Sequence, residues 1–195
     1  MKNKKTLRMA QLSLLIAILL VMAYTPLGYF RTPGLEITFL MVPVSVGAIV
    51  LGPSAGAILG FVFGLTSFGT CFGSSTFGAT LLGVSVVKTF ITCVITRTLA
   101  GWVAGLIFKG LKNFKFGISV ASLCAPLLNT LLFMTSLTIC FYNTEFIQSI
   151  STSIGATNPI TFIMLFVGIQ GLIEAVVCFI ANSIISTAVY KYLNK

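Results

Sequence analysis

The chain has 195 residues, of which 57% are hydrophobic, and only 3 are acidic against 12 Lys and Arg. Because so few charged groups cannot cover the surface of a globule, we exclude a soluble domain and predict an integral membrane protein. The net charge of +9 does not indicate a nucleic-acid partner, because the basic residues lie at the ends of apolar segments rather than along one polar face.

About 20 apolar residues cross a bilayer as a helix, and the chain is apolar from end to end, interrupted only by short connections. We therefore predict an all-α membrane protein with six transmembrane helices that forms one domain over residues 1–195. In chain order, the predicted spans cover residues 7–25, 37–51, 54–68, 81–108, 117–142 and 159–190. The first span also resembles a signal peptide, because lysines precede it and Val21-Met22-Ala23 forms a small-residue site; cleavage there would leave five spans.

The distribution of basic residues predicts the orientation of the chain in the cell membrane. Lys and Arg cluster in the N-terminal segment, in the connection 109–116 and at the C-terminus. With six spans these three segments lie on one side, whereas the opposite connections carry only Arg31, Glu36 and Glu145. Since cytoplasmic segments are enriched in Lys and Arg, we predict that both termini are cytoplasmic.

The third predicted span carries a regular row of glycines. Gly52, Gly56, Gly60 and Gly64 recur every four residues, so they form one smooth face on which another helix can approach closely. We predict that this face packs inside the bundle, and an intermolecular contact is the alternative.

The first predicted span carries a different set of small residues. Ala10, Ser13 and Ala17 are spaced by three and four residues, which places them on one side of the helix. Because this span is the first in the chain, we interpret its small face as a docking surface for another membrane protein.

Polar side chains inside the spans are the strongest indication of a binding site. A charge at the bilayer centre costs roughly 2.5–3.5 kcal/mol on insertion scales, so such groups need a structural or functional reason. The candidate substrate-binding residues are Lys88, Arg97, Asn129, Gln170 and Glu174. Lys88 and Arg97 are nine residues apart, which is about half a turn around an α-helix, and Asn129 follows Pro126, which frees a backbone carbonyl.

The charges of these residues favour an anionic ligand. Two cations face one carboxylate, so a cavity lined by these groups has one spare positive charge and suits a monoanion. Asn129 and Gln170 add donors and acceptors for hydroxyl or amide groups. The alternative is a structural ion pair between Glu174 and either Arg97 or Lys88.

Two connections on the outer side are candidate lids over such a cavity. The first contains Tyr29, Phe30 and Arg31, and the second contains Phe72 and Ser75. The alternative is that both are ordinary connecting loops.

The sequence provides little for catalysis or for a cofactor. It contains no His and no Asp, and no nucleophile–base pair is visible, so we predict that the protein is not an enzyme. The five cysteines are scattered without metal-ligand spacing, so we predict no metal and no cofactor.

Three stretches resemble the substrate-specific (S) components of energy-coupling factor (ECF) transporters. They are residues 41–68, which resemble the signature of the second and third spans, the run Arg97-Thr98-Leu99-Ala100-Gly101, and the run Leu128-Asn129-Thr130-Leu131-Leu132. The family pattern has His after the Met of the second-span motif, where this chain has Val42.

The resemblance implies a six-helix vitamin-binding subunit that captures its substrate from outside and works with a transmembrane coupling subunit and two ATPases. Family members contact the coupling subunit through an Ala-x3-Ala face on the first span, which Ser13-x3-Ala17 matches in part. The chain is most similar to the pantothenate group, in which the resemblance implies that Arg97 and Asn129 hold the substrate. Pantothenate is a monoanion, which matches the spare positive charge, and it has hydroxyl and amide groups, which match the donors and acceptors of Asn129 and Gln170.

Other functions stay open on the sequence alone. S components for folate, pyridoxine-type vitamins, cobalamin or riboflavin are alternatives to the pantothenate type. A stand-alone secondary transporter is a second class, although a lone Glu174 is a meagre proton relay. A structural or assembly protein of the membrane is a third.

Overall fold

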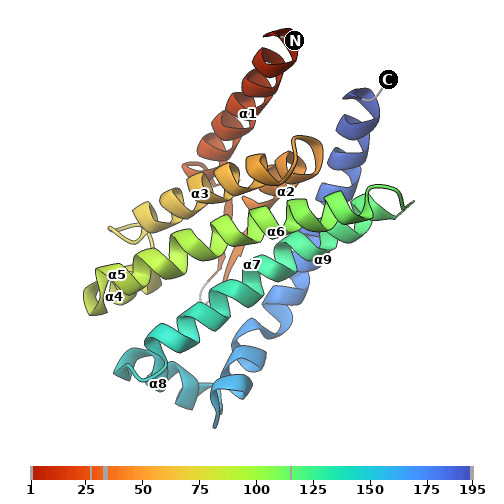
Figure 1. The fold of residues 1–195 in the computed structure, drawn as a ribbon. Helices are drawn as coiled ribbons and strands as arrows, with labels where there is room; N and C mark the ends of the chain where they lie inside the picture. The colour runs from red at the N-terminus through yellow and green to blue at the C-terminus, as the bar shows by residue number, and fades with distance from the viewer. Residues whose placement is uncertain (1, 27, 33–34, 115, 194–195) are drawn as a thin grey trace.

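The computed structural model describes residues 2–26, 28–32, 35–114 and 116–193, and within them the chain is helical apart from one two-stranded hairpin (Figure 1). The elements are α1 (Lys2–Ala23), β1 (Tyr29–Thr32), β2 (Leu35–Thr38), α2 (Met41–Val50), α3 (Pro53–Thr70), α4 (Thr76–Val84), α5 (Val86–Phe90), the π-helix η1 (Ile91–Ile95), α6 (Thr96–Leu111), α7 (Gly117–Phe141), α8 (Glu145–Ser153) and α9 (Pro159–Leu193).

Five helical stretches in this part of the chain are long and apolar enough to cross a membrane. They are Lys5–Ala23, Pro53–Thr70, Val86–Leu111, Gly117–Phe141 and Ile173–Tyr190. The prediction for residues 117–142 agrees with α7 to within one residue. The second predicted span is the one missing from the five, and the fourth and sixth are interrupted.

The second predicted span, residues 37–51, is wrong at its start. Residues 37 and 38 belong to β2, which pairs antiparallel with β1, and α2 is only ten residues long. Every residue of α2 except Val50 is buried. A ten-residue helix rises only about 15 Å, so α2 is a short internal helix enclosed by its neighbours.

The fourth predicted span, residues 81–108, is broken near its N-terminal end. Ser85 has extended backbone angles (φ −165°, ψ 115°), ends α4 and caps α5, where its hydroxyl accepts from the Lys88 amide at 3.5 Å. Residues 81–84 therefore belong to a separate short helix. From Val86 the chain runs through α5, η1 and α6 as one continuous membrane-length segment.

The sixth predicted span, residues 159–190, is divided in two. Gly168 has a left-handed backbone conformation (φ 26°, ψ −128°) inside α9, which splits it into a short apolar helix ending at Gly168 and the membrane-length stretch Ile173–Tyr190. Glycine tolerates this conformation because it has no Cβ. The connection 143–158, predicted as a polar loop, contains the short helix α8.

The glycine face of α3 packs inside the bundle, as predicted. A Cβ on Gly56 would collide with the carbonyl oxygen of Gly101, and one on Gly60 would collide with the carbonyl oxygen of Arg97. A Cβ on Gly64 would lie 2.6 Å from the Cα of Val94. The backbones of α3 and the η1–α6 segment therefore touch over their whole shared length.

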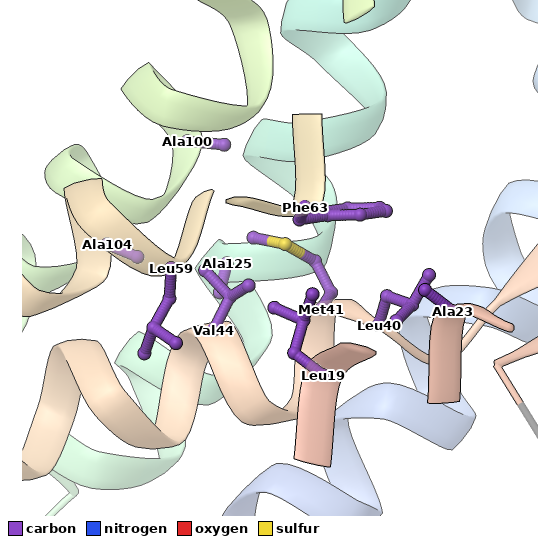
Figure 2. Close-up of a cluster of buried hydrophobic side chains, with 10 residues drawn as sticks. All are labelled: Leu19, Ala23, Leu40, Met41, Val44, Leu59, Phe63, Ala100, Ala104 and Ala125. Atoms are coloured by element: carbon purple, nitrogen blue, oxygen red, sulfur yellow. The ribbon is translucent and has the colours of Figure 1, made fainter. Parts of the chain in front are cut away.

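Figure 2 shows the core that forms where five helices meet. It combines large and small buried side chains: Leu19, Ala23, Leu40, Met41, Val44, Leu59, Phe63, Ala100, Ala104 and Ala125. The alanines of α6 and α7 leave room for the larger side chains of α2 and α3, so the helices interdigitate at the density of a protein interior.

Pro126 lies inside α7 and cannot donate to the carbonyl of Ser122 one turn earlier. In the structure the side-chain amide of Asn182, on α9, donates to this carbonyl at 3.4 Å. Asn182 is fully buried, so a side chain of one helix satisfies the backbone group that proline releases on another.

Candidate functional site

Arg97 is the centre of the candidate site, and it is buried near the middle of the bundle. Its side chain is only 8% exposed, and its Nη1 donates to the Cys93 carbonyl at 3.1 Å. The guanidinium lies between two aromatic rings, 4.7 Å from the centroid of Phe63 and 5.0 Å from that of Phe133. The two rings hold the cation by cation–π attraction and orient its plane.

Local geometry around Arg97 follows from the backbone packing described above. Gly60 of α3 touches the Arg97 carbonyl, so helix α3 fixes the position of this residue along the segment. The π-helix η1 ends just before it, and Arg97 bonds back to the Cys93 carbonyl within η1. A π segment in the middle of a span often marks a functional position.

Three buried side chains around this point have polar atoms without a hydrogen-bond partner. They are Nε of Arg97, Oδ1 of Asn129 and Oε1 of Glu174. Asn129 lies one turn before Phe133 on α7, so the two residues share the face that meets Arg97. Unpaired polar atoms inside an apolar bundle cost free energy, so they indicate a place where a polar ligand completes the hydrogen bonding.

Glu174 approaches the site from α9, six residues beyond the break at Gly168. It is 7% exposed and lies within electrostatic reach of Arg97, and the Thr38 backbone amide lies within hydrogen-bonding reach of its carboxylate. Among these described side chains, neither Arg97 nor Lys88 forms an ion pair with Glu174. The structural ion pair considered from the sequence is therefore not formed, and both charged groups keep an unpaired polar atom.

The structure places Lys88 apart from this group, toward the N-terminal end of the same segment. Its side chain is exposed, and its Nζ donates to the Cys140 carbonyl of α7 at 3.2 Å. Between them, the hydroxyls of Thr92 and Ser136 hydrogen-bond at 3.0 Å. Both cations thus face α7 although an ideal α-helix would set them half a turn apart, because η1 lies between them and a π turn contains more residues than an α turn.

The remaining predicted residues differ in how far the structure describes them. The side chain of Gln170 lies outside the described part, and so do those of Tyr29, Phe30 and Arg31, whose backbones form most of β1. Phe72 is 68% exposed in the turn after α3. The Ser75 hydroxyl instead caps α4 by accepting from the Gly78 amide at 3.2 Å, which gives this residue a structural role.

The small face of α1 points away from the bundle. Leu19 and Ala23 are the buried residues of this helix, whereas Ala10, Ser13 and Ala17 are all exposed. On a helical wheel these three small residues lie opposite Leu19. The face that is smooth enough for close packing is therefore not covered by the part of the chain that the structure describes.

Several residues of the site were not predicted from the sequence. Phe63 and Phe133 were missed because the chain has 17 Phe, and nothing in their spacing separates ring partners of a cation from ordinary core residues. Thr38 was missed because it approaches the Glu174 carboxylate with its backbone and not with its side chain. The apolar pattern of residues 37–51 also gave no indication that β2 ends at Thr38. The described residues contain no group of three or more His, Cys, Asp or Glu that could hold a metal.

Comparisons with known proteins agree with this architecture. Residues 7–186 match the family model described as ECF transporter, substrate-specific component. The chain is 30% identical to the pantothenic acid transporter PanT of Lactococcus lactis subsp. cremoris (strain MG1363), over 86% of this chain and 91% of that protein. It is 31% identical to the pantothenate transporter PanT of Leuconostoc mesenteroides subsp. mesenteroides, over 67% of each chain.

Proposed function

The chain belongs to the family of substrate-specific components of ECF transporters, and we propose that the vitamin it binds is pantothenate. Family membership gives it a role in vitamin uptake as a multi-pass protein of the cell membrane. The choice of pantothenate is supported by two relatives that carry this substrate in their names and by the chemistry of the buried polar groups around Arg97.

The single observation that carries the proposal is the buried, ring-flanked guanidinium of Arg97, whose Nε has no hydrogen-bond partner. Pantothenate has one carboxylate, one amide and two hydroxyls, and a guanidinium is the donor that matches a carboxylate best. We assign the carboxylate to Arg97, and the amide and hydroxyl groups to Asn129 and Glu174, whose free oxygens accept hydrogen bonds. Gln170 belongs to the same face of α9 as Glu174 by its spacing of four residues.

Lys88 and the outer connections have a secondary role in this proposal. The exposed ammonium of Lys88 lies about two helical turns before Arg97 on the same segment, and it attracts the anion before the anion reaches the buried site. Two outer connections close over the bound vitamin: the β1–β2 hairpin, which carries Tyr29, Phe30 and Arg31, and the turn that carries Phe72. Ser75 fixes the start of α4, which follows that turn.

The proposed topology and partners complete the assignment. We place both termini in the cytoplasm and treat residues 1–195 as one domain. In this topology the hairpin and the short helix α2 together take the place of the second of the six predicted spans. The chain itself has the role of a binding subunit rather than an enzyme. We infer that a transmembrane coupling subunit docks on the exposed Ala10, Ser13 and Ala17 face of α1, and that two ATPases drive release.

Direct binding measurements on the purified chain test the substrate and the role of Arg97. Radiolabelled pantothenate should bind the unmodified chain in detergent, and Arg97→Gln should weaken this binding about tenfold to a hundredfold, because charge-assisted hydrogen bonds contribute roughly 1.5–3 kcal/mol each. Lys5→Gln is the matched control, since it removes one exposed positive charge far from the site. Equal binding by the two variants would overturn the role of Arg97.

The identity of the vitamin is tested separately by mass spectrometry of small molecules that co-purify with the chain. Pantothenate is the expected molecule. Recovery of folate, riboflavin, cobalamin or a pyridoxine-type vitamin in its place would overturn the substrate while leaving the family unchanged.

A further inference from the structure

A groove of about 510 Å³ lies at the end of the bundle where both termini emerge, away from the Arg97 site. It is formed by the start of α1, the α2–α3 turn and the C-terminal ends of α6 and α9 (Figure 1). Its lining includes the cations Arg8, Lys109 and Lys112 and the apolar or aromatic residues Leu7, Phe108 and Tyr190. None of the residues assigned to the vitamin site contributes to it.

The groove is strongly cationic, because none of the described residues that line it is acidic. Arg8 is held in place by its Nη2, which donates to the Leu51 carbonyl and to the Ser54 hydroxyl, both at 2.9 Å. Lys109 and Lys112 are exposed at the end of α6. The first turn of α3 also adds the positive end of a helix dipole beside Pro53.

The walls of the groove are rigid and partly apolar. A Cβ on Gly105 would lie 2.6 Å from the Cα of Pro53, so α6 packs directly on the start of α3 and fixes the shape of the groove. Phe108 and Tyr190 form an edge-to-face pair with ring centroids 5.6 Å apart. Tyrosine is enriched at the level where a membrane meets water, because its ring is apolar and its hydroxyl is polar.

We propose that this groove binds the phosphate head group of an anionic phospholipid from the cytoplasmic leaflet. Basic pockets between helix ends on that side attract acidic head groups, and the apolar wall beside the three cations gives the glycerol and upper acyl chains a surface that a free phosphate ion would not use. The assignment of this end to the cytoplasm rests on the topology given under the proposed function. The lipid would link α1, the α2–α3 turn and the C-terminal ends of α6 and α9.

Native mass spectrometry of the full chain, released from mixed phosphatidylglycerol and phosphatidylcholine nanodiscs, tests the proposal. The unmodified chain should retain phosphatidylglycerol in preference to phosphatidylcholine, and Lys109→Gln combined with Lys112→Gln should reduce this retention about thirtyfold, since each cation near the surface contributes about 1 kcal/mol. Arg8 is left intact because its hydrogen bonds also hold the α2–α3 turn.

The control is Lys5→Gln, which removes an exposed charge from the same end of the chain; Lys5 is not among the described residues that line the groove. It should retain phosphatidylglycerol like the unmodified chain, and thermal melting in detergent shows whether each variant is folded. Equal retention by all three proteins would overturn the proposal, and so would displacement of the lipid by excess inorganic phosphate, which would indicate a site for a soluble anion.

A protein occupant is distinguished by assembly with the other transporter subunits. If the unmodified chain shows no lipid preference and the groove variant fails to assemble with the coupling subunit, the groove is a protein contact and the lipid proposal is wrong. None of these measurements uses pantothenate. A negative lipid result therefore does not contradict the proposed vitamin site, and a negative pantothenate-binding result does not contradict the proposed lipid site.

Discussion

Helix α1 and the segment Val86–Leu111 are both long and apolar enough to cross a membrane, yet they are packed in opposite ways. Within an apolar 18-residue window of each, only 6% of the residues are buried within the chain in α1, against 50% in Val86–Leu111. The difference lies in where the small residues point. Gly101 meets the glycine row of α3, whereas the Ala10, Ser13 and Ala17 face of α1 is open. Hydropathy therefore indicates that a helix enters the membrane, and the direction of its smooth face indicates what it packs against.

The largest effect on the stability of the isolated chain is expected from Gly60→Ala. The new Cβ would collide with the backbone carbonyl of Arg97 and lie 3.1 Å from the Cα of Thr98. Because backbone atoms cannot move aside as a flexible side chain can, α3 and α6 must separate, at a cost of about 1–3 kcal/mol. Thermal melting in detergent should show a lower midpoint, and pantothenate binding should weaken because Arg97 moves with its backbone.

Gly69→Ala is the matched control in the same helix. Nothing lies within 4 Å of a Cβ at this position, so the substitution should be neutral or slightly stabilising. Equal melting temperatures for the two variants would mean that the α3–α6 contact is not as close as described, and the contrast with α1 would lose its physical basis.

A smaller effect is expected for the hydrogen bond between Thr92 and Ser136, which links the buried segment to α7. Such bonds between membrane helices contribute on average about 0.6 kcal/mol. A double-mutant cycle with Thr92→Val, Ser136→Ala and the combined variant should return a coupling free energy of that size in detergent unfolding. Ser13→Ala removes an exposed hydroxyl from α1 and should leave stability unchanged. A coupling near zero would show that this contact does not hold the segment against α7.

Much of the architecture could be predicted from the sequence, because apolar length and charge placement are directly visible in it. The span that became α7 is an uninterrupted apolar run, so its limits were found to within one residue. The second span was misjudged because residues 37–51 are almost continuously apolar across the change from β2 to α2. The breaks at Ser85 and Gly168 were missed for the same reason, since the residues on both sides are apolar and hydropathy does not register a change of backbone direction.

The candidate site was predicted in its chemistry more than in its geometry. Arg97, Asn129 and Glu174 stood out because polar groups are costly inside a membrane, and all three are buried with an unpaired atom. Lys88 carries the same kind of signal, but its side chain is exposed and donates to the Cys140 carbonyl near the start of the segment. Counting residues along an ideal α-helix could not reveal η1, which sets the relative direction of Lys88 and Arg97.

The smallest effect on the isolated chain, and the most direct test of the open helix, is expected from Ala17→Trp. Its side chain is exposed on the side of the helix away from Leu19, so a bulky ring there points away from the core of the chain. Melting temperature and pantothenate binding should stay unchanged, while uptake in cells that contain the coupling subunit and ATPases should be lost. Ile18→Trp, one residue along and about 100° around the helix, adds a similar ring on a surface that is 42% exposed, and it should leave uptake intact. If Ala17→Trp transports as well as Ile18→Trp, the exposed face of α1 contacts lipid alone, and its low burial has no bearing on coupling.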